Sequence, residues 1–265
     1  MTRPQPEVRP IPSAADDLWR QILNENPQAR RRRRLHRAIP SAPRCKLCLS
    51  PFGAPGYWVM RFRGHPRWSK NPKYCAGCFR MIERNHGGAE IECSLLFADV
   101  RGSTALAEGM PARDFNRLMG RFHDVAFEVV VDRDGFVDKF VGDEIIGIFV
   151  PAMAGTDHAR QALEAARELM RRTGHHDARG PWLPIGAGVA TGIAYVGSVG
   201  QGPDTDLTAM GDLVNTTARL ASQAGRGEIL VPLETAVVLG LPADLERRLL
   251  TLRGKRQPTE AVVLK

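Results

Sequence analysis

The sequence predicts an α+β protein in which a small metal-stapled module precedes a ferredoxin-like, split βαβ sheet. The chain has 265 residues, of which 43% are hydrophobic and 25% charged, so it can bury one sizeable core and a second, smaller one. Four of its five cysteines stand in two Cys-x-x-Cys pairs within residues 45–90. After residue 90 the apolar residues follow strand and helix spacings in turn. No apolar run is long enough to span a membrane and no secretory signal opens the chain, so a cytoplasmic protein is expected.

The distribution of charge also changes near residue 90. The net charge is +8, yet residues 91–265 hold more acidic than basic side chains. Residues 1–44 hold ten arginines, four acids and seven prolines, which predicts a basic, disordered arm with one short helix over residues 15–23. The arginine run at residues 30–34 is expected either to be solvated or to bind an anionic partner, which could be nucleic acid, lipid or an acidic protein.

Residues 45–90 are expected to form a module held together by a metal. The pairs Cys45/Cys48 and Cys75/Cys78 are separated by 26 residues. Two such turns can place four thiolates around one ion, and without a secretory signal a metal is favoured over disulfides. Zn²⁺ is the expected ion, and an iron–sulfur cluster is the first alternative. Unliganded or redox-active thiols are the remaining interpretation.

Residues 91–265 are expected to form the larger domain. An apolar run predicts a buried strand over residues 91–98, and apolar side chains spaced i, i+3, i+4 and i+7 predict a helix over residues 111–131. Two apolar runs around the turn Gly142-Asp143-Glu144 predict a hairpin. The later elements are expected as a helix over 156–173 ending at Gly174, a hairpin of strands 185–191 and 193–199, a helix over 211–224, and strands 228–231, 245–252 and 259–264. This order is typical of a split βαβ sheet with helices on one face.

Two acidic residues stand where chemistry could occur. Asp99 ends the first predicted strand and precedes Gly102, Ser103 and Thr104, which open a helix. A carboxylate there can hold a cation, and the backbone N–H groups of the helix start can face phosphates. Asp143 lies in the turn of the next hairpin, which the predicted sheet brings beside the end of the first strand. Two acids in that position can share two divalent cations and support phosphoryl transfer.

Three segments resemble motifs of the class III nucleotidyl cyclases, and the resemblance covers residues 91–265. Residues 96–104 (LFADVRGST) resemble the first metal motif of the family, and residues 139–144 (KFVGDE) resemble the second. Residues 206–219 (DLTAMGDLVNTTAR) are similar to the segment that carries the transition-state residues. Thr208 replaces the more common aspartate of the family, as in a threonine-containing bacterial subgroup.

The resemblance implies a role for each matching residue. Asp99 and Asp143, with Val100 included among the metal ligands, would bind two Mg²⁺ or Mn²⁺ ions. Lys139 and Thr208 would contact adenine, and Asn215 would orient the ribose. Arg219 would stabilise charge on the α-phosphate, and Lys255 would contact the terminal phosphates. Asn215 and Arg219 are four residues apart on one predicted helix, so they share a face.

The resemblance therefore implies an adenylate cyclase that converts ATP to 3′,5′-cyclic AMP and pyrophosphate. In this family the metal-binding aspartates and the base- and phosphate-binding residues of one site come from two subunits, so a homodimer is expected. Two alternatives stay open. One is a diguanylate cyclase, whose hairpin has a similar Gly-Asp-Glu turn. The other is a nucleic-acid-binding regulator that uses the cyclase fold only for dimerisation.

Overall fold

The structure, a computed structural model, describes residues 14–24, 26–252, 255 and 257–265. The α-helices are α1 (Ala14–Leu23), α2 (Pro27–Ala38), α3 (Gly56–Phe62), α4 (Ala76–Arg84), α5 (Ser103–Glu108), α6 (Ala112–Asp132), α7 (Pro151–Ala154), α8 (His158–Arg172), α9 (Asp212–Gln223) and α10 (Leu233–Val238). The strands are β1 (Gly88–Val100), β2 (Phe136–Val141), β3 (Glu144–Phe149), β4 (Ile185–Val199), β5 (Asp206–Met210), β6 (Ile229–Pro232), β7 (Arg247–Leu250) and β8 (Thr259–Leu264). Within these residues no helix combines the length and the apolar character needed to cross a membrane.

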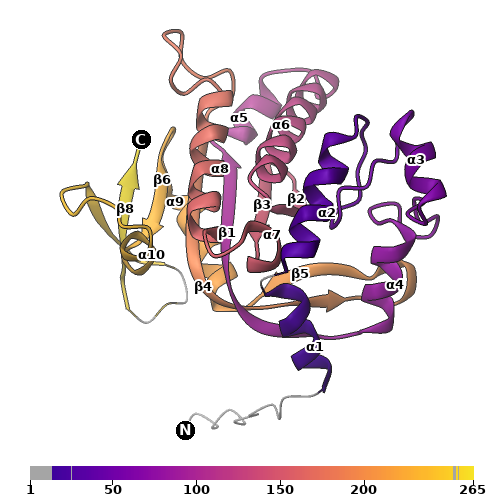
Figure 1. Ribbon diagram of the computed structural model, residues 1–265. Helices are drawn as coiled ribbons and strands as arrows, with labels where there is room; N and C mark the ends of the chain where they lie inside the picture. The colour runs from indigo at the N-terminus through magenta and orange to yellow at the C-terminus, as the bar shows by residue number, and fades with distance from the viewer. Residues whose placement is uncertain (1–13, 25, 253–254, 256) are drawn as a thin grey trace, which may run out of the picture.

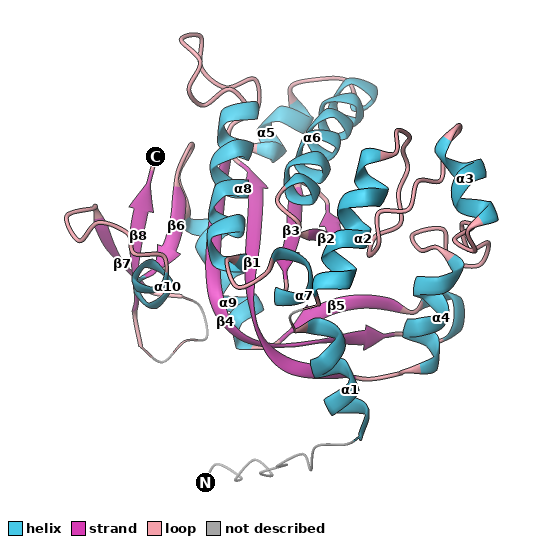
Figure 2. Ribbon diagram, viewed as in Figure 1, coloured by secondary structure: helices cyan, strands magenta, loops and turns pink. Residues whose placement is uncertain are grey.

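The strands form one mixed sheet, shown in Figure 2, in the order β2-β3-β1-β4-β6-β8-β7, with β5 pairing to β4 outside this path. Its centre is the antiparallel ladder between β1 and β4, which runs from Gly88 opposite Gly197 to Val100 opposite Ile185. The pair β4 and β6 is parallel, whereas β1 pairs antiparallel with β3. This arrangement confirms the α+β class and the split βαβ sheet predicted from the sequence.

Both faces of the sheet are covered, whereas the sequence pattern predicts helices on one face. Side chains alternate along β1: Leu96 and Ala98 belong to a core that contains residues of α6 and α8, and Leu95 and Phe97 point into a second core. The second core contains residues of α1, α4 and α9 and all four cysteines of the two pairs. The N-terminal module and the sheet therefore share one hydrophobic core. Figure 1 shows α1 to α4 gathered on the side of β2 and β5, away from β6 and β8.

The hairpin expected over residues 185–199 is absent, because these residues form the single strand β4. Its predicted turn at Gly192 instead pairs with Cys93 of β1, inside the ladder. The hairpin partner of β4 is β5, which the sequence pattern does not reveal. The continuous ladder with β1 supplies backbone hydrogen bonds on both sides of Gly192, so the glycine does not break the strand.

The sequence predicts a disordered arm at the N-terminus, but residues 14–23 and 27–38 form the helices α1 and α2. Residues 1–13 lie outside the described residues. The α1 helix agrees with the short helix predicted at residues 15–23, and it buries Trp19 completely. The Trp19 indole Nε1 donates a hydrogen bond to the Asn85 carbonyl at 2.7 Å. The arginine run is part of α2, whose first turn is capped by the Asn26 side chain through the Ala29 N–H at 2.9 Å.

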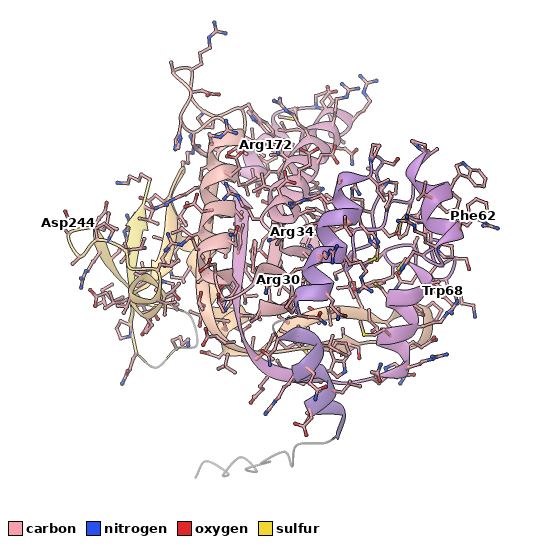
Figure 3. All side chains as sticks on the ribbon, viewed as in Figure 1. Arg30, Arg34, Phe62, Trp68, Arg172 and Asp244 are labelled. Atoms are coloured by element: carbon pink, nitrogen blue, oxygen red, sulfur yellow. The ribbon has the colours of Figure 1, made fainter. Side chains whose placement is uncertain are left out.

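One arginine of the run is structural. Arg33 is 2% exposed, and its guanidinium donates hydrogen bonds to the Leu47 carbonyl and, at 2.7 Å, to the Gly135 carbonyl. Burial lowers the pKa of Arg33 to about 10. Arg30 and Arg34, labelled in Figure 3, lie one turn apart on the same helix, and Arg34 is exposed. Arg33 thus joins α2 both to the cysteine module and to the loop before β2.

Replacing Arg33 with alanine should lower the free energy of unfolding by about 2–3 kcal/mol, because two buried carbonyls lose their donors. Arg34→Ala is the matched control, since it removes the same charge from the exposed side of the helix and should change stability by about 0.5 kcal/mol or less. Urea unfolding of the full chain measures both. Equal effects of the two substitutions would contradict the structural role of Arg33.

Candidate active site and four-cysteine centre

Three acidic side chains meet at the end of β1. Asp99 stands opposite Glu144 in the β1–β3 ladder, and Asp143 precedes Glu144 in the turn. The Val100 N–H donates to the Asp143 backbone carbonyl at 3.3 Å, which fixes the turn against β1. Gly142 has φ of +63°, a left-handed conformation that glycine adopts without strain. Sheet pairing thus brings Asp99 and Asp143 together, as the sequence predicts.

Burial and mutual repulsion raise the pKa values of two carboxyl groups of this cluster. Burial raises the pKa of Asp99, and the neighbouring Asp143 raises it further. Burial and the charges of Asp99 and Asp143 raise the pKa of Glu144 to about 7. The Arg101 guanidinium donates to the Asp99 carboxylate and provides the nearby positive charge. Crowded carboxylate oxygens are hard ligands of the kind that Mg²⁺ and Mn²⁺ prefer, so these residues fit a divalent-metal site.

A cavity of about 610 Å³ adjoins this cluster, lined by Asp143, Gly142, Ser103, Thr104 and His123 among others. Gly102 precedes α5 with φ of +74°, and Ser103 and Thr104 begin that helix. The predicted phosphate-facing residues therefore lie beside the acids. His123 was not predicted: its Nε2 lies 3.3 Å from the Gly142 carbonyl, and its ring packs on Phe140 with centroids 4.3 Å apart. Its place on the amphipathic helix α6 gave no sign of this contact.

Lys139 and Thr208 come together at a third residue, Asp138. The Thr208 hydroxyl donates to Asp138 Oδ2 at 2.7 Å, and Lys139 Nζ lies 3.5 Å from the same oxygen. Asp138 is at a register shift in the β2–β3 pairing, and its side chain is only 4% exposed. Lys139 and Asp138 line a cavity of about 380 Å³ with Lys46 of the cysteine module. The sequence identifies Lys139 and Thr208 but not the carboxylate between them.

The remaining predicted residues lie on and beside α9. Asn215 is exposed and Arg219 half-buried, one turn apart on this helix. Lys255 makes an ion pair with Asp212 at the start of α9, and both line a cavity of about 320 Å³. Within the described part of one chain, Asp143, Lys139 and Lys255 thus line three different cavities.

The four cysteines of the two pairs form one buried cluster. Their sulfur atoms all lie within 4.8 Å of one another, and Cys48 Sγ and Cys75 Sγ are 3.6 Å apart. A tetrahedral zinc thiolate site with Zn–S bonds of about 2.3 Å has sulfur–sulfur edges of about 3.8 Å, so the cluster has the right size for one ion. Hydrogen bonds from the other three sulfurs lower the pKa of the Cys75 thiol. Cys93, the fifth cysteine, lies in β1 outside this group.

Comparison with known proteins agrees with this geometry. The family described as the adenylate and guanylate cyclase catalytic domain matches residues 89–264. An uncharacterized protein of Mycobacterium tuberculosis is 31% identical over 183 residues, which are 67% of this chain and 34% of that protein. Adenylate cyclase 1 of Rhizobium meliloti is 32% identical over 148 residues, which are 52% of this chain and 22% of that protein. The chain thus spans about a third or less of the length of these relatives.

Solved structures show the same fold. The crystal structure of the adenylyl cyclase CyaB from P. aeruginosa superposes with a TM-score of 0.58 and 25% identity, covering 67% of this chain and 96% of that one. The guanylyl cyclase Cya2 superposes with a TM-score of 0.60 and 23% identity, covering 67% and 93%. The matched region contains the acids at the end of β1, Lys139, Thr208 and α9, and the four-cysteine module precedes it. The chain therefore belongs to the adenylate and guanylate cyclase catalytic domain family.

Proposed function

We propose that this protein converts ATP to 3′,5′-cyclic AMP and pyrophosphate at sites shared between two copies of the chain. The observation that supports this best is the separation, within one chain, of the acidic cluster from the Lys139 and Lys255 groups. A homodimer with a two-fold axis would place the acids of one chain against the Lys139, Thr208, Asn215 and Arg219 of the other and build two equal sites. The similarity to adenylate cyclases of Rhizobium meliloti and P. aeruginosa supports ATP as the substrate.

In the proposed reaction the 3′-oxygen of the ribose attacks the α-phosphorus, and the bond from that phosphorus to the bridging oxygen of pyrophosphate breaks. The 3′-hydroxyl proton leaves to solvent, and no protein nucleophile is needed because the ribose oxygen itself attacks. Asp99, Asp143 and the backbone of Val100 would hold two Mg²⁺ or Mn²⁺ ions, which when bound lower the pKa of the hydroxyl and neutralise charge on the leaving group.

The other residues of the site would act on the substrate directly. Asn215 would orient the ribose, and Arg219, four residues later on α9, would hold the charge that builds up on the α-phosphate. Lys255 would leave its ion pair with Asp212 for the terminal phosphates. Ser103 and Thr104 line the cavity beside Asp143, and together with Gly102 before α5 they would face the phosphates.

Product analysis tests the proposal. The purified protein is incubated with ATP or with GTP in the presence of Mn²⁺, and the products are identified by mass. Cyclic AMP and pyrophosphate are expected from ATP, at a higher kcat/KM than any product from GTP. Cyclic GMP and pyrophosphate from GTP, at a higher kcat/KM than the reaction of ATP, would assign a guanylate cyclase, and a cyclic dinucleotide would assign a diguanylate cyclase. If neither substrate gives a cyclic product, the remaining interpretation is a regulatory protein with a cyclase fold.

We also propose that the four cysteines bind zinc. A single ion brings four sulfurs to one centre, as the cluster requires, whereas a four-iron cluster binds each cysteine at a different iron and needs them further apart. The purified protein should be colourless and contain about one zinc per chain by elemental analysis.

Two cysteine variants test whether zinc binding depends on the four clustered cysteines in particular. Cys75→Ser should lose the zinc and unfold at lower temperature, because the module depends on its metal. Cys93→Ala, which removes the buried cysteine outside the cluster, should keep the zinc. Brown protein that bleaches in air would instead indicate an iron–sulfur cluster, and four freely reactive thiols without zinc or iron would exclude a metal site.

The exposed arginines of α2 support a separate proposal, the binding of an anionic partner. Arg31, Arg32 and Arg34 are exposed, whereas Arg33 is buried. Binding of the full chain to anionic lipid vesicles or to duplex DNA should fall steeply with salt if these arginines carry it. Binding that persists in an Arg31→Gln, Arg32→Gln, Arg34→Gln variant would contradict this role.

A further inference from the structure

Lys46, a residue of the cysteine module, reaches into the cyclase sheet. Its side chain is 7% exposed, and its Nζ lies 2.7 Å from Asp206 Oδ1, 2.9 Å from the Leu207 carbonyl and 3.0 Å from the Asp138 carbonyl. The Asp138 carboxylate oxygen Oδ1 is 3.4 Å away. An ammonium has three protons to donate, so the Asp206 carboxylate and the two carbonyls use its full capacity, and the Asp138 carboxylate lies within ion-pair distance of the same charge. Lys46 therefore connects β2, which carries Lys139, to β5, which carries Thr208.

Asp138 determines in which direction Thr208 can form hydrogen bonds. The carboxylate faces the positive charge of Lys46 with Oδ1 and accepts a hydrogen bond from the Thr208 hydroxyl on Oδ2. An ionised carboxylate can only accept hydrogen bonds, so the single hydroxyl proton of Thr208 points at Asp138. Toward any ligand the Thr208 oxygen then presents only lone pairs. This side chain acts as an acceptor even though a threonine in general can do either.

An acceptor at this position distinguishes the two purine bases. The 6-position of adenine carries an amino group, which donates, and the 6-position of guanine carries an oxygen, which accepts. When its proton is held by Asp138, the Thr208 oxygen can accept a hydrogen bond from the adenine amino group. Opposite guanine, the Thr208 oxygen and the 6-oxygen are both acceptors, and no hydrogen bond forms between them. A mismatched base contact of this kind lowers affinity roughly 10- to 100-fold.

The metal-binding turns hold this arrangement from both sides. Lys46 lies between Cys45 and Cys48, so its backbone belongs to the first turn of the cluster. Beside the second turn, Lys73 Nζ binds Asp206 Oδ2 at 2.6 Å. The Tyr74 hydroxyl also donates to Asp206, and it accepts a hydrogen bond from the Leu207 N–H at 3.0 Å. Both turns therefore converge on Asp206, two residues before Thr208.

We infer that the four-cysteine module is part of the base-recognition apparatus: Lys46 holds Asp138 in place, and Asp138 makes Thr208 an acceptor that selects adenine. Lys46 and Asp138 are positioning residues, since they act on the base through Thr208. The inference rests on the proposed function, in which Thr208 and Lys139 face the base. It gives the N-terminal module a defined effect on the reaction.

The ratio of kcat/KM for ATP to kcat/KM for GTP tests this inference. Lys46→Met keeps the length of the side chain and removes the ammonium, and it should lower the ratio about tenfold or more, mainly through a higher KM for ATP. Lys70→Met removes an exposed lysine of the same module that is not among the contacts to Asp206, and it should leave the ratio within about twofold. The ratio is independent of the fraction of folded enzyme, because both rates come from one preparation.

Two further variants separate positioning from general stability. In Asp138→Asn the side-chain amide can donate a hydrogen bond to the Thr208 oxygen. The Thr208 hydroxyl proton is then free to point at the base, so the ratio of kcat/KM for ATP to kcat/KM for GTP should fall as well. In a Thr208→Val background, where no hydroxyl is present, Lys46→Met should leave the ratio unchanged. If Lys46→Met slows both substrates equally with wild-type Thr208, Lys46 is only structural and the inference is wrong while the cyclase function stands. If the wild type forms no cyclic nucleotide, both the proposed function and this inference fail.

Discussion

Asp143→Ala should abolish cyclic-nucleotide formation while leaving the fold intact. Asp143 lies in the β2–β3 turn next to Asp99, and one remaining carboxylate would not hold two cations. Retention of more than about a tenth of the wild-type rate, which corresponds to roughly 1.4 kcal/mol of barrier, would contradict the two-metal assignment. Initial rates at saturating ATP and Mn²⁺ measure this. The matched control is Asp244→Ala, an exposed acid that Figure 3 shows on the side of the C-terminal strands.

The same variant should not be less stable than the wild type. Asp143 raises the pKa of both Asp99 and Glu144, so at neutral pH its charge disfavours the folded state. Removing it should leave the melting temperature in metal-free buffer unchanged or higher. The increase in melting temperature on adding Mn²⁺, which follows from binding to the folded state, should become smaller. A large fall in melting temperature would contradict this and would attribute the lost activity to unfolding instead of to the loss of a metal ligand.

Arg219→Ala should lower kcat far more than it raises KM, because its contact with the α-phosphate matters mainly in the transition state. Arg219 projects from α9, on the face of the sheet opposite α8. Arg160→Ala, an exposed arginine on α8, is the matched control and should leave both constants near their wild-type values.

Mixing the inactive Asp143→Ala and Arg219→Ala proteins should restore activity. In a heterodimer one of the two sites contains the intact acids of one chain and the intact Arg219 of the other, and the second site contains both defects. Free exchange of subunits gives half heterodimers with one good site each, so about a quarter of the wild-type rate is expected. No recovery despite subunit exchange, shown by differently tagged chains, would contradict the shared-site arrangement.

The four-cysteine module and the cyclase sheet share a buried apolar core, so the attraction between a basic and an acidic region is not the main contact between them. Trp19, Phe79 and the four cysteines belong to the same core as Leu95 and Phe97 of β1. A chain that begins near Gly88 would expose the apolar face formed by Leu95 and Phe97. It would also lack Lys46, which contacts Asp138. Such a truncation is therefore expected to change substrate selection and solubility together, and the full chain is the better material for functional tests.

The sequence by itself determined the features that are encoded locally. The spacing of apolar residues placed α6 and α8, the Gly142-Asp143-Glu144 turn placed the first hairpin, and the two Cys-x-x-Cys pairs identified the residues of the four-cysteine cluster. The motifs around Asp99, Lys139 and Arg219 identified the candidate site residues, because each motif is a short continuous segment whose residue types are tied to its chemistry.

The tertiary structure alone decided the features that depend on distant partners. Gly192 stays within β4 because β1 pairs with it across the sheet, and α2 is folded because Arg33 meets carbonyls at Leu47 and Gly135. Asp138 lies 92 residues from Lys46 and 70 residues from Thr208 along the chain, yet one carboxylate binds both. Local spacing carries no information about such contacts, since the free energy that fixes them comes from burial and hydrogen bonding between segments that only the folded chain brings together.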